Sequence, residues 1–179
     1  DGRRPSQVHF TDAQRDAQRR DFTINGLFLD PIANQVIDYV GGQKDLANRR
    51  LRAIGEPAAR FREDHLRLLR AVRFAARFQL NIDPATAEAM RIHAPMLQRI
   101  SPERIADELR LMLTPISRAI AWPMLWEYAL IDVICRFLPS AETAELDRSR
   151  SIFLAIDPQQ AIPFGLALAG MVLDYQWQS

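Results

Sequence analysis

Cysteine and lysine are almost missing from this sequence of 179 residues, since Cys135 and Lys44 are their only examples. A single cysteine excludes a disulfide within the chain and gives no support to a zinc site built on several cysteines. No apolar run approaches the ~20 residues that a membrane-spanning helix needs, and no segment has the pattern of a signal peptide. These absences favour a globular protein of a reducing, cytoplasmic compartment with no membrane partner.

Aromatic residues make up only 8% of the chain, whereas alanine and leucine are abundant, which favours helices over strands. Apolar residues make up 48% and charged residues 25%, and this ordinary globular composition argues against disorder. The length allows one sizeable domain or two small ones. Because the first residue is Asp1 rather than Met, we expect the chain to be a piece of a longer protein.

The basic residues are arginines with one exception, and they are unevenly distributed. Residues 1–110 hold 19 basic and 15 acidic side chains, whereas residues 111–179 hold 4 and 7. The planar guanidinium group suits phosphates and base edges better than an ammonium group does. A genome rich in G and C would give the same bias through its codons, so composition alone does not establish a nucleic-acid partner.

Two short apolar segments, 22–29 and 36–40, have the composition of strands and predict a hairpin. A polar helix over 11–21 precedes them, with Thr11 or Asp12 as its N-cap. From Gly41-Gly42 onward the apolar spacing is helical. We predict that residues 46–179 are nearly all helical, with β structure confined to residues before about 42.

The strongest helix prediction runs from Glu63 to Phe78, where an apolar stripe lies beside a row of arginines. Asp83-Pro84 and Ser101-Pro102 each place a capping residue before a proline and predict the starts of two further helices. Between Ile116 and Leu138 we expect two shorter helices, interrupted near Pro123. Their aromatic residues are expected in the core: Trp122, Trp126 and Tyr128.

Two motifs lie in the first 46 residues. In the run Arg19-Arg20-Asp21-Phe22-Thr23-Ile24-Asn25, the adjacent arginines could grip phosphates or could form an exposed charged turn, and composition alone favours the turn. In the run from Asp38 to Leu46, paired glycines permit a tight turn with positive φ. This run lacks the glycine spacing and the terminal Lys-Ser/Thr of a phosphate-binding loop, which favours a hinge into a helix.

A third motif contains Asp64 and Arg67, which are neighbours if both lie on the predicted helix. They could form an intrahelical ion pair that contributes a few tenths of a kcal/mol. Arg67, Arg70 and Arg73 also continue as a row with a spacing of three. Such a row would present a cationic ridge, and an anion such as a triphosphate would offset the repulsion between its members.

In order and spacing, these three motifs resemble the class II RNA nucleotidyltransferases, the family of CCA-adding enzymes and bacterial poly(A) polymerases. The resemblance covers about residues 1–113, including Ile100 to Leu109, and residues 114–179 share only helical character. It implies a mainly α fold: residues 1–45 as a small β/α remnant of the nucleotidyltransferase head, 46–113 as a helical neck that binds the nucleotide base and RNA, and 114–179 as a helical body.

The resemblance also implies roles for single residues. Arg20 would contact nucleotide phosphate or sugar, and Asp64 with Arg67 would face the base edge. The implied nucleotide-binding residues are Arg19, Arg20, Asp21, Asp64, Arg67, Arg70 and Arg73. The implied hinge or structural residues are Asn25, Gly41, Gly42, Asp45 and Glu63.

The chemistry of the bases fits the roles of Asp64 and Arg67. Cytosine and adenine both present an amino donor beside a ring-nitrogen acceptor, which a carboxylate and a guanidinium group complement. Uracil and guanine present the reverse pattern, so acceptor would face acceptor and donor would face donor. Each polar group left unpaired in a closed site costs about 1–3 kcal/mol.

The family's metal-binding motifs, a Gly-Gly-x-Val-Arg-Asp loop and an Asp-x-Asp pair, do not occur in this sequence. Because metal-assisted phosphoryl transfer depends on such carboxylates, we expect the chain alone to be inactive and the intact enzyme to use Mg²⁺, CTP and ATP. The preferred function is CCA addition to RNA, with tRNA as the expected substrate. Poly(A) addition is the first alternative, and a non-catalytic helical RNA-binding module is the alternative of another class. The sequence gives no oligomeric state.

Overall fold

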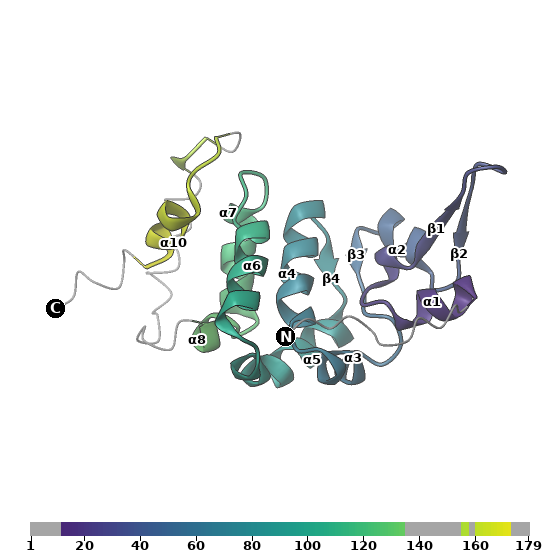
Figure 1. The fold of residues 1–179 in the computed structure, drawn as a ribbon, viewed down its shortest axis with the longest axis horizontal. Coiled ribbons are helices and arrows are strands. Elements are labelled where there is room, and N and C mark those ends of the chain that lie inside the picture. Colours follow the sequence, from purple (N-terminus) through teal and green to yellow (C-terminus); the bar gives the residue numbers. More distant parts are fainter. Residues whose placement is uncertain (1–11, 135–154, 158–159, 173–179) are drawn as a thin grey trace.

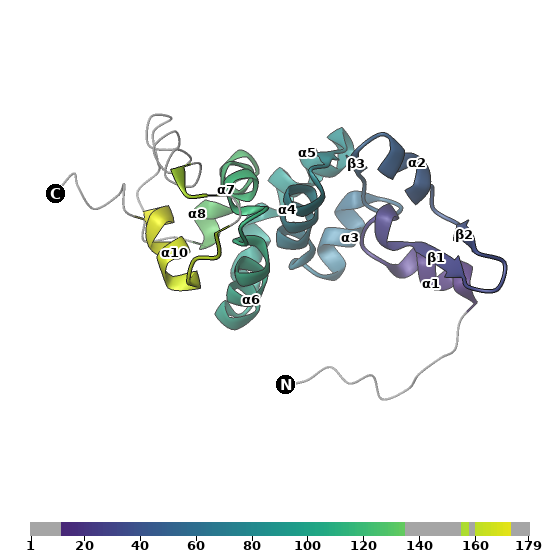
Figure 2. The same ribbon diagram turned by 90° about the horizontal axis from the view of Figure 1, so that it is seen from above.

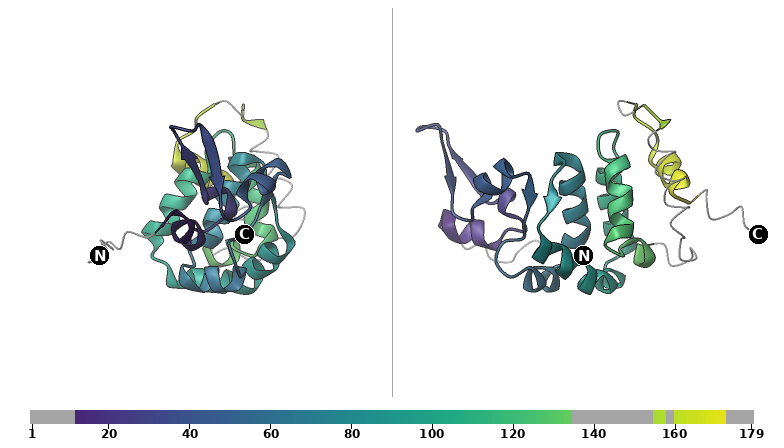
Figure 3. Two further views of the ribbon diagram at one scale, coloured as in Figure 1. Left: turned by 90° about the vertical axis from the view of Figure 1, so that its right-hand side faces the viewer. Right: turned by 180° about the vertical axis from the view of Figure 1, so that it is seen from behind.

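The computed structural model of the protein describes residues 12–134, 155–157 and 160–172. Its helices and strands follow one another in a row, from a β hairpin at one end to helix α10 at the other (Figure 1). The same order is seen from behind (Figure 3). In chain order the elements are α1 (Ala13–Arg19), the 3-10 helix η1 (Thr23–Asn25), β1 (Leu27–Asp30), β2 (Gln35–Asp38), α2 (Gly42–Ala47), β3 (Arg50–Leu51), α3 (Pro57–Glu63), α4 (Arg67–Phe78), β4 (Asn81–Ile82), α5 (Pro84–His93), the 3-10 helix η2 (Ala94–Arg99), α6 (Pro102–Met112), α7 (Arg118–Glu127), α8 (Ile131–Ile134) and α10 (Phe164–Val172). The mainly α prediction is confirmed.

The predicted polar helix and hairpin are both present. Asp12 caps α1, because its carboxylate accepts a hydrogen bond from the Arg15 N–H. Strands β1 and β2 pair antiparallel, with Leu27 opposite Asp38. The first strand begins later than expected, since η1 occupies the start of the apolar segment and the fully buried Phe22 forms an isolated bridge with Ala53.

The prediction that β structure ends before about residue 42 is wrong in one respect. The two-residue strands β3 and β4 lie beyond that point and pair in parallel. The Asn81 N–H donates to the Arg49 carbonyl at 2.8 Å, and the Asp83 N–H donates to the Leu51 carbonyl at 2.9 Å. These bonds join the segment before α3 to the start of α5, which Asp83 caps as predicted.

The predicted helix from Glu63 to Phe78 is two helices. Helix α3 ends at Glu63, Asp64 is extended with φ −149° and ψ 108°, and α4 begins at Arg67. At the break the Asp64 carboxylate accepts the Leu66 N–H, and His65 Nδ1 bonds the Phe61 carbonyl at 2.7 Å. Side chains that bond the nearby backbone in this way compete with the helical pattern. Asp64 and Arg67 therefore do not lie three apart on one helix.

Helix α4 is at the centre of the fold. Seen from above, it lies between α3 and α5 on one side and α6 and α7 on the other (Figure 2). Of the apolar stripe predicted here, Leu66, Leu69, Val72 and Ala76 are buried, whereas Phe74 is partly buried and Phe78 is 48% exposed. The buried residues within α4 itself are Leu68, Leu69, Ala71, Val72, Ala75 and Ala76.

The predicted interruption near Pro123 is also wrong. Pro123 lies inside α7, and the chain turns after it, at Ala129, whose φ is 54°. Proline removes one backbone hydrogen bond from the helix, but Trp122 and Leu125 beside it are buried and hold both turns in the core. The prediction for residues 135–138, with Cys135, lies outside the described residues. Of the helices that are described, none is long and apolar enough to cross a membrane.

The arginines of α4 do not form an unneutralised cationic ridge. Three of them, Arg67, Arg70 and Arg73, are each paired with a carboxylate from a different segment, and Arg77 lies over the ring of Phe78. Arg67 lies 2.5 Å from Glu63 of α3, Arg70 lies 2.6 Å from Asp21 after α1, and Arg73 lies 3.1 Å from Glu108 of α6. We therefore find that the repulsion expected along this row is already offset within the chain.

Two of these carboxyl groups have pKa values shifted in opposite directions. Burial alone would raise the pKa of Asp21, but the hydrogen bond from Asn25 and the charge and hydrogen bond of Arg70 outweigh it and hold that pKa below its ordinary value. Burial raises the pKa of Glu108 by more than Arg73 and Arg70 lower it. The Arg73 N–H is not aimed at Glu108, so this close ion pair is not also a hydrogen bond.

We expect Gly42→Ala to lower the free energy of unfolding by about 1–3 kcal/mol, since overpacking costs about that much. A Cβ at Gly42 would lie 2.2 Å from the Thr23 carbonyl oxygen, a backbone atom that cannot move aside freely. Gly165→Ala is the matched control, because nothing lies within 4 Å of the added Cβ there. Urea unfolding of both variants tests this, and an equal effect of the two would contradict it.

The two buried carboxyl groups predict opposite pH dependences. The contribution of Asp21 is present above its ordinary pKa of 3.8 and is lost as the pH falls through its lower folded pKa. The contribution of Glu108 is present below its ordinary pKa of 4.5 and is lost as the pH rises through its higher folded pKa. Asp21→Asn should therefore destabilise by about 1–3 kcal/mol at pH 6 and by less at pH 3. Glu108→Gln should instead lower the free energy of unfolding more at pH 3 than at pH 6. Urea unfolding between pH 3 and 7 checks this, and parallel changes would count against it.

Candidate nucleotide-binding site

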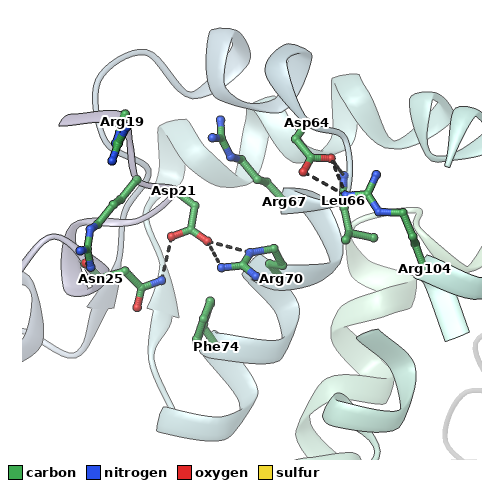
Figure 4. A pocket seen from close by; sticks show the side chains of 10 residues that line it. Arg19, Asp21, Asn25, Asp64, Leu66, Arg67, Arg70, Phe74 and Arg104 are labelled. Atoms are coloured by element: carbon green, nitrogen blue, oxygen red, sulfur yellow. Dashed lines mark hydrogen bonds and ion pairs between the residues drawn. The ribbon is translucent and has the colours of Figure 1, made fainter. Parts of the chain in front are cut away.

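A cavity of about 580 Å³ lies where the end of α1, η1, the α3–α4 break, α4 and α6 meet. Figure 4 shows the side chains that line it. They are Arg19, Arg20, Asp21, Asn25, Asp64, Leu66, Arg67, Arg70, Phe74 and Arg104. Six of the seven nucleotide-binding residues that the resemblance implies are among them. The exception is Arg73, which points to Glu108 instead.

The charge of the cavity is positive but mixed, since five guanidinium groups and two carboxylates line it. Its volume is within the range of about 300–1,000 Å³ that is usual for small-molecule sites. Guanidinium groups bind phosphates through paired, charge-assisted hydrogen bonds. A wall that combines such donors with carboxylate acceptors can therefore bind an anion that also carries amino groups.

The adjacent arginines at the end of α1 are fixed by one acidic side chain. Asp16 lies 2.5 Å from Arg19 and 2.7 Å from Arg20. Hydrogen bonds from Arg20 and Arg19 lower the pKa of the Asp16 carboxyl. Arg20 also donates to the Asn25 carbonyl at 2.7 Å and lies over the ring of Phe28. Arg19 and Arg20 are thus an ordered pair at the rim rather than a freely solvated turn.

Asp21 lines the cavity, but most of its acceptor sites are taken by other described residues. Its Oδ1 accepts from the Phe22 N–H at 2.9 Å and from the Asn25 amide at 2.8 Å. Its Oδ2 accepts from Arg70 Nε at 2.8 Å, and Arg70 Nη2 lies 2.6 Å away. Since a carboxylate offers about four lone-pair sites, these three hydrogen bonds and the close Nη2 contact occupy most of them. It holds Asn25 and Arg70 in place (Figure 4).

Asp64 and Arg67 line the same cavity, and they are joined by a backbone hydrogen bond but not through their side chains. The nearest partner of Asp64 across the cavity is Arg104, whose Nη2 lies 3.2 Å from its Oδ2. Arg67 Nη1 donates to Glu63 and to the Arg60 carbonyl, and the hydrogen bond from Arg67 lowers the pKa of Glu63. The alternative of an intrahelical ion pair between Asp64 and Arg67 is therefore wrong.

Three further motif residues, Gly41, Asp45 and Glu63, do not line the cavity but fix the segments around it. Gly41 adopts a φ of 82°, a conformation that favours glycine. Asp45 is buried, and its carboxylate accepts from Thr23 Oγ1 at 2.7 Å and from Arg52 Nε at 2.9 Å. These bonds join α2 to η1, which precedes the hairpin. Glu63 lies beside the cavity and bonds both Arg60 and Arg67.

Sequence reasoning did not assign to this site three residues that line the cavity, Leu66, Phe74 and Arg104, nor two that pair with its arginines, Asp16 and Glu108. Asp16 lies three and four residues before the paired arginines, and that spacing predicts helical neighbours. Arg104 and Glu108 lie four apart on α6, which places them on the same face. Both spacings were visible in the sequence, but the partners across the fold were not.

A metal site is not formed by the described residues. Within 12–134, 155–157 and 160–172, no three His, Cys, Asp or Glu side chains come together as ligands. The acidic residues of the cavity are instead bonded to arginines and backbone N–H groups. None of them is therefore assigned to a metal ion.

Comparisons with known proteins agree on one family. Residues 1–52 match the family described as "Poly A polymerase head domain", and residues 79–142 match "Probable RNA and SrmB- binding site of polymerase A". The CCA-adding enzyme of Streptococcus pyogenes serotype M5 is 50% identical over 117 residues, or 64% of this chain. The chain spans 29% of the length of that relative.

Solved structures show the same likeness. The Bacillus stearothermophilus CCA-adding enzyme in complex with CTP matches with a TM-score of 0.77 and 30% identity, over 96% of this chain and 42% of that one. The Thermotoga maritima CCA-adding enzyme complexed with tRNA matches with a TM-score of 0.76, over 89% and 41%, and at 23% identity shows the fold alone. The motifs, the fold and these matches lead to the same conclusion: the chain belongs to the class II RNA nucleotidyltransferases, the family of CCA-adding enzymes and bacterial poly(A) polymerases.

Proposed function

We propose that this chain is the base-selecting part of a tRNA CCA-adding nucleotidyltransferase, which adds C and A to the RNA 3′ end from CTP and ATP. The observation that carries the proposal is that Asp64 and Arg67 line one cavity of nucleotide size together with an arginine-rich rim. The relatives named above as CCA-adding enzymes support this choice. A reducing, cytoplasmic setting and the Mg²⁺ requirement of the intact enzyme are parts of the same proposal.

Both base-reading groups retain unused hydrogen-bonding capacity. The Asp64 carboxylate accepts from the Leu66 N–H and from Arg104, which leaves a lone pair on Oδ2 for an amino group. Of the three guanidinium nitrogens of Arg67, Nη1 is the one that bonds other described residues. Its Nε and Nη2 can therefore donate to a ring nitrogen. One acceptor and one donor in the same cavity complement cytosine and adenine and oppose uracil and guanine.

The rim supplies the other half of a nucleotide site. Arg19 is well exposed and Arg20 partly so, with side-chain exposures of 64% and 41%. Asp16 orders both without covering them, so each can still donate to phosphate oxygens. We assign Arg20 to phosphate or sugar contact. We also retain the proposed division into head remnant (1–45), neck (46–113) and body (114–179).

Poly(A) addition is the second candidate, because both matching family descriptions refer to polymerase A. The cavity does not separate the two activities, since both use ATP and the same donor–acceptor pair. The length of the product does. An intact enzyme that stops after three added nucleotides is a CCA-adding enzyme, and one that extends the RNA further with A alone is a poly(A) polymerase.

We expect Asp64→Ala in the intact enzyme to lower the preference for CTP and ATP over UTP and GTP by about 10- to 100-fold. A hydrogen bond to a charged group contributes about 1.5–3 kcal/mol, and 1.4 kcal/mol corresponds to a factor of ten. The measurement is kcat/KM for all four triphosphates. Asp107→Ala is the control, because Asp107 is an exposed acidic residue whose one ion pair within the described part of the chain is with its helical neighbour Arg110. An unchanged preference in Asp64→Ala would reject the base-reading role.

The chain by itself should incorporate no nucleotide into tRNA in the presence of Mg²⁺. Metal-assisted phosphoryl transfer depends on carboxylates that hold the ions, and the sequence contains no Asp-x-Asp pair. The assay is labelled CTP and ATP incorporation by the purified chain, with the intact enzyme as the positive control. Incorporation above background would show that the metal-binding residues lie within these 179 residues.

A further inference from the structure

Asp64 is held by a residue from a distant part of the chain. Its backbone is extended rather than helical, so no helical turn fixes its side chain. Oδ1 accepts from the Leu66 N–H at 3.1 Å, a contact within the same short link. Among the described residues, the one side chain that bonds the carboxylate is Arg104 of α6, whose Nη2 lies 3.2 Å from Oδ2 and 3.5 Å from Oδ1.

We propose that Arg104 is a positioning residue that sets base specificity by orienting the Asp64 carboxylate. The proposal rests on the base-reading function proposed for Asp64 and deepens it. Arg104 acts through Asp64 and not by a contact of its own with the base.

The need for such a residue follows from the geometry of base reading. A carboxylate favours an amino group over a carbonyl only if its lone pairs are aimed at the base edge, since hydrogen bonds weaken steeply when they are misaligned. If the Leu66 N–H were its only partner, the Asp64 carboxylate could rotate about its side-chain bonds. It would then distinguish cytosine and adenine less well from uracil and guanine. Arg104 bonds Oδ2 and, at a longer distance, Oδ1, and thereby fixes the plane of the carboxylate and the direction of the lone pair left on Oδ2 (Figure 4).

The position of Arg104 is itself fixed, because α6 is anchored one turn further along. Glu108 is buried, with 6% of its surface exposed, and its carboxylate lies 3.1 Å from Arg73 and 4.0 Å from Arg70. Leu109 beside it is buried in the core. Helix α6 therefore lies in a fixed register on α4 and presents Arg104 to Asp64 from a rigid support. This arrangement is typical of residues that order a binding site.

The test is a double-mutant cycle in the intact enzyme, with Arg104→Ala, Asp64→Ala and the double variant. The readout is the ratio of kcat/KM for CTP and ATP to that for UTP and GTP. We expect Arg104→Ala to lower this ratio about tenfold, and Arg104→Lys, which keeps the charge and one donor, to restore part of it. In the Asp64→Ala background, Arg104→Ala should change the ratio by less than about twofold, because its target is gone.

Two controls separate positioning from folding. Arg110→Ala removes another arginine of α6, which pairs with Asp107 and does not line the cavity, and it should leave the ratio unchanged. The melting temperature of each variant is measured beside its kinetics. A merely structural role for Arg104 would lower stability and the rates for all four triphosphates together, leave the ratio intact, and so overturn the proposal. Should Arg104→Ala not fold, Arg104→Lys gives the same comparison.

The outcomes also distinguish the proposed role of Arg104 from the base-reading function of Asp64 on which it rests. A reduced ratio in Asp64→Ala with an unchanged ratio in Arg104→Ala overturns the role of Arg104 and leaves base reading by Asp64 in place. An unchanged ratio in Asp64→Ala overturns the base-reading function itself. Losses that add in the double variant show that Arg104 contacts the nucleotide directly, and they overturn its role as a positioning residue.

Discussion

The bond between Arg70 and Asp21 is the interaction on which the rest of the site depends. It crosses 49 residues of sequence and joins the segment after α1 to the central helix α4. The far side of Arg70 approaches Glu108, so one guanidinium group lies between the end of α1 and α6. Burying such charges gains little net stability, because the desolvation penalty offsets much of the attraction. What the arrangement supplies is geometry, since each carboxylate accepts only from certain directions.

This geometry divides the charged residues into two groups. Asp21, Arg73 and Glu108 are turned inward and use their charges on one another. The second group contains Arg19, Arg20, Arg67 and Asp64, which are each bonded on one side and open on the other. Only the second group can bind a ligand without breaking the fold. Motif membership alone does not reveal this division, because Arg67, Arg70 and Arg73 look equivalent in the sequence.

The sequence predicted those features that depend on neighbouring residues. The cap at Asp12, the proline start after Asp83, the hairpin and the buried face of α4 all follow from spacings of a few residues. Two other predictions failed because specific contacts overrode the local propensity. The break at Asp64 depends on side-chain bonds to the backbone, and Pro123 is tolerated because of tertiary packing around α7. Propensity is a weak prior wherever tertiary contacts oppose it. The ion-pair partners of Arg70 and Arg73 could not be assigned, since they come from two segments that are distant in the sequence.

The failed helix prediction also explains how the site is formed. On one unbroken helix, Asp64 and Arg67 would be adjacent and would satisfy each other, which would leave neither free to read a base. The break after Glu63 separates their side chains. Arg67 forms an ion pair with Glu63, and Asp64 forms one with Arg104 of α6. Each is then held by a partner that leaves its other bonding positions open. The same break leaves Asp64 in an extended conformation, where the one side chain that bonds its carboxylate among the described residues comes from the distant helix α6.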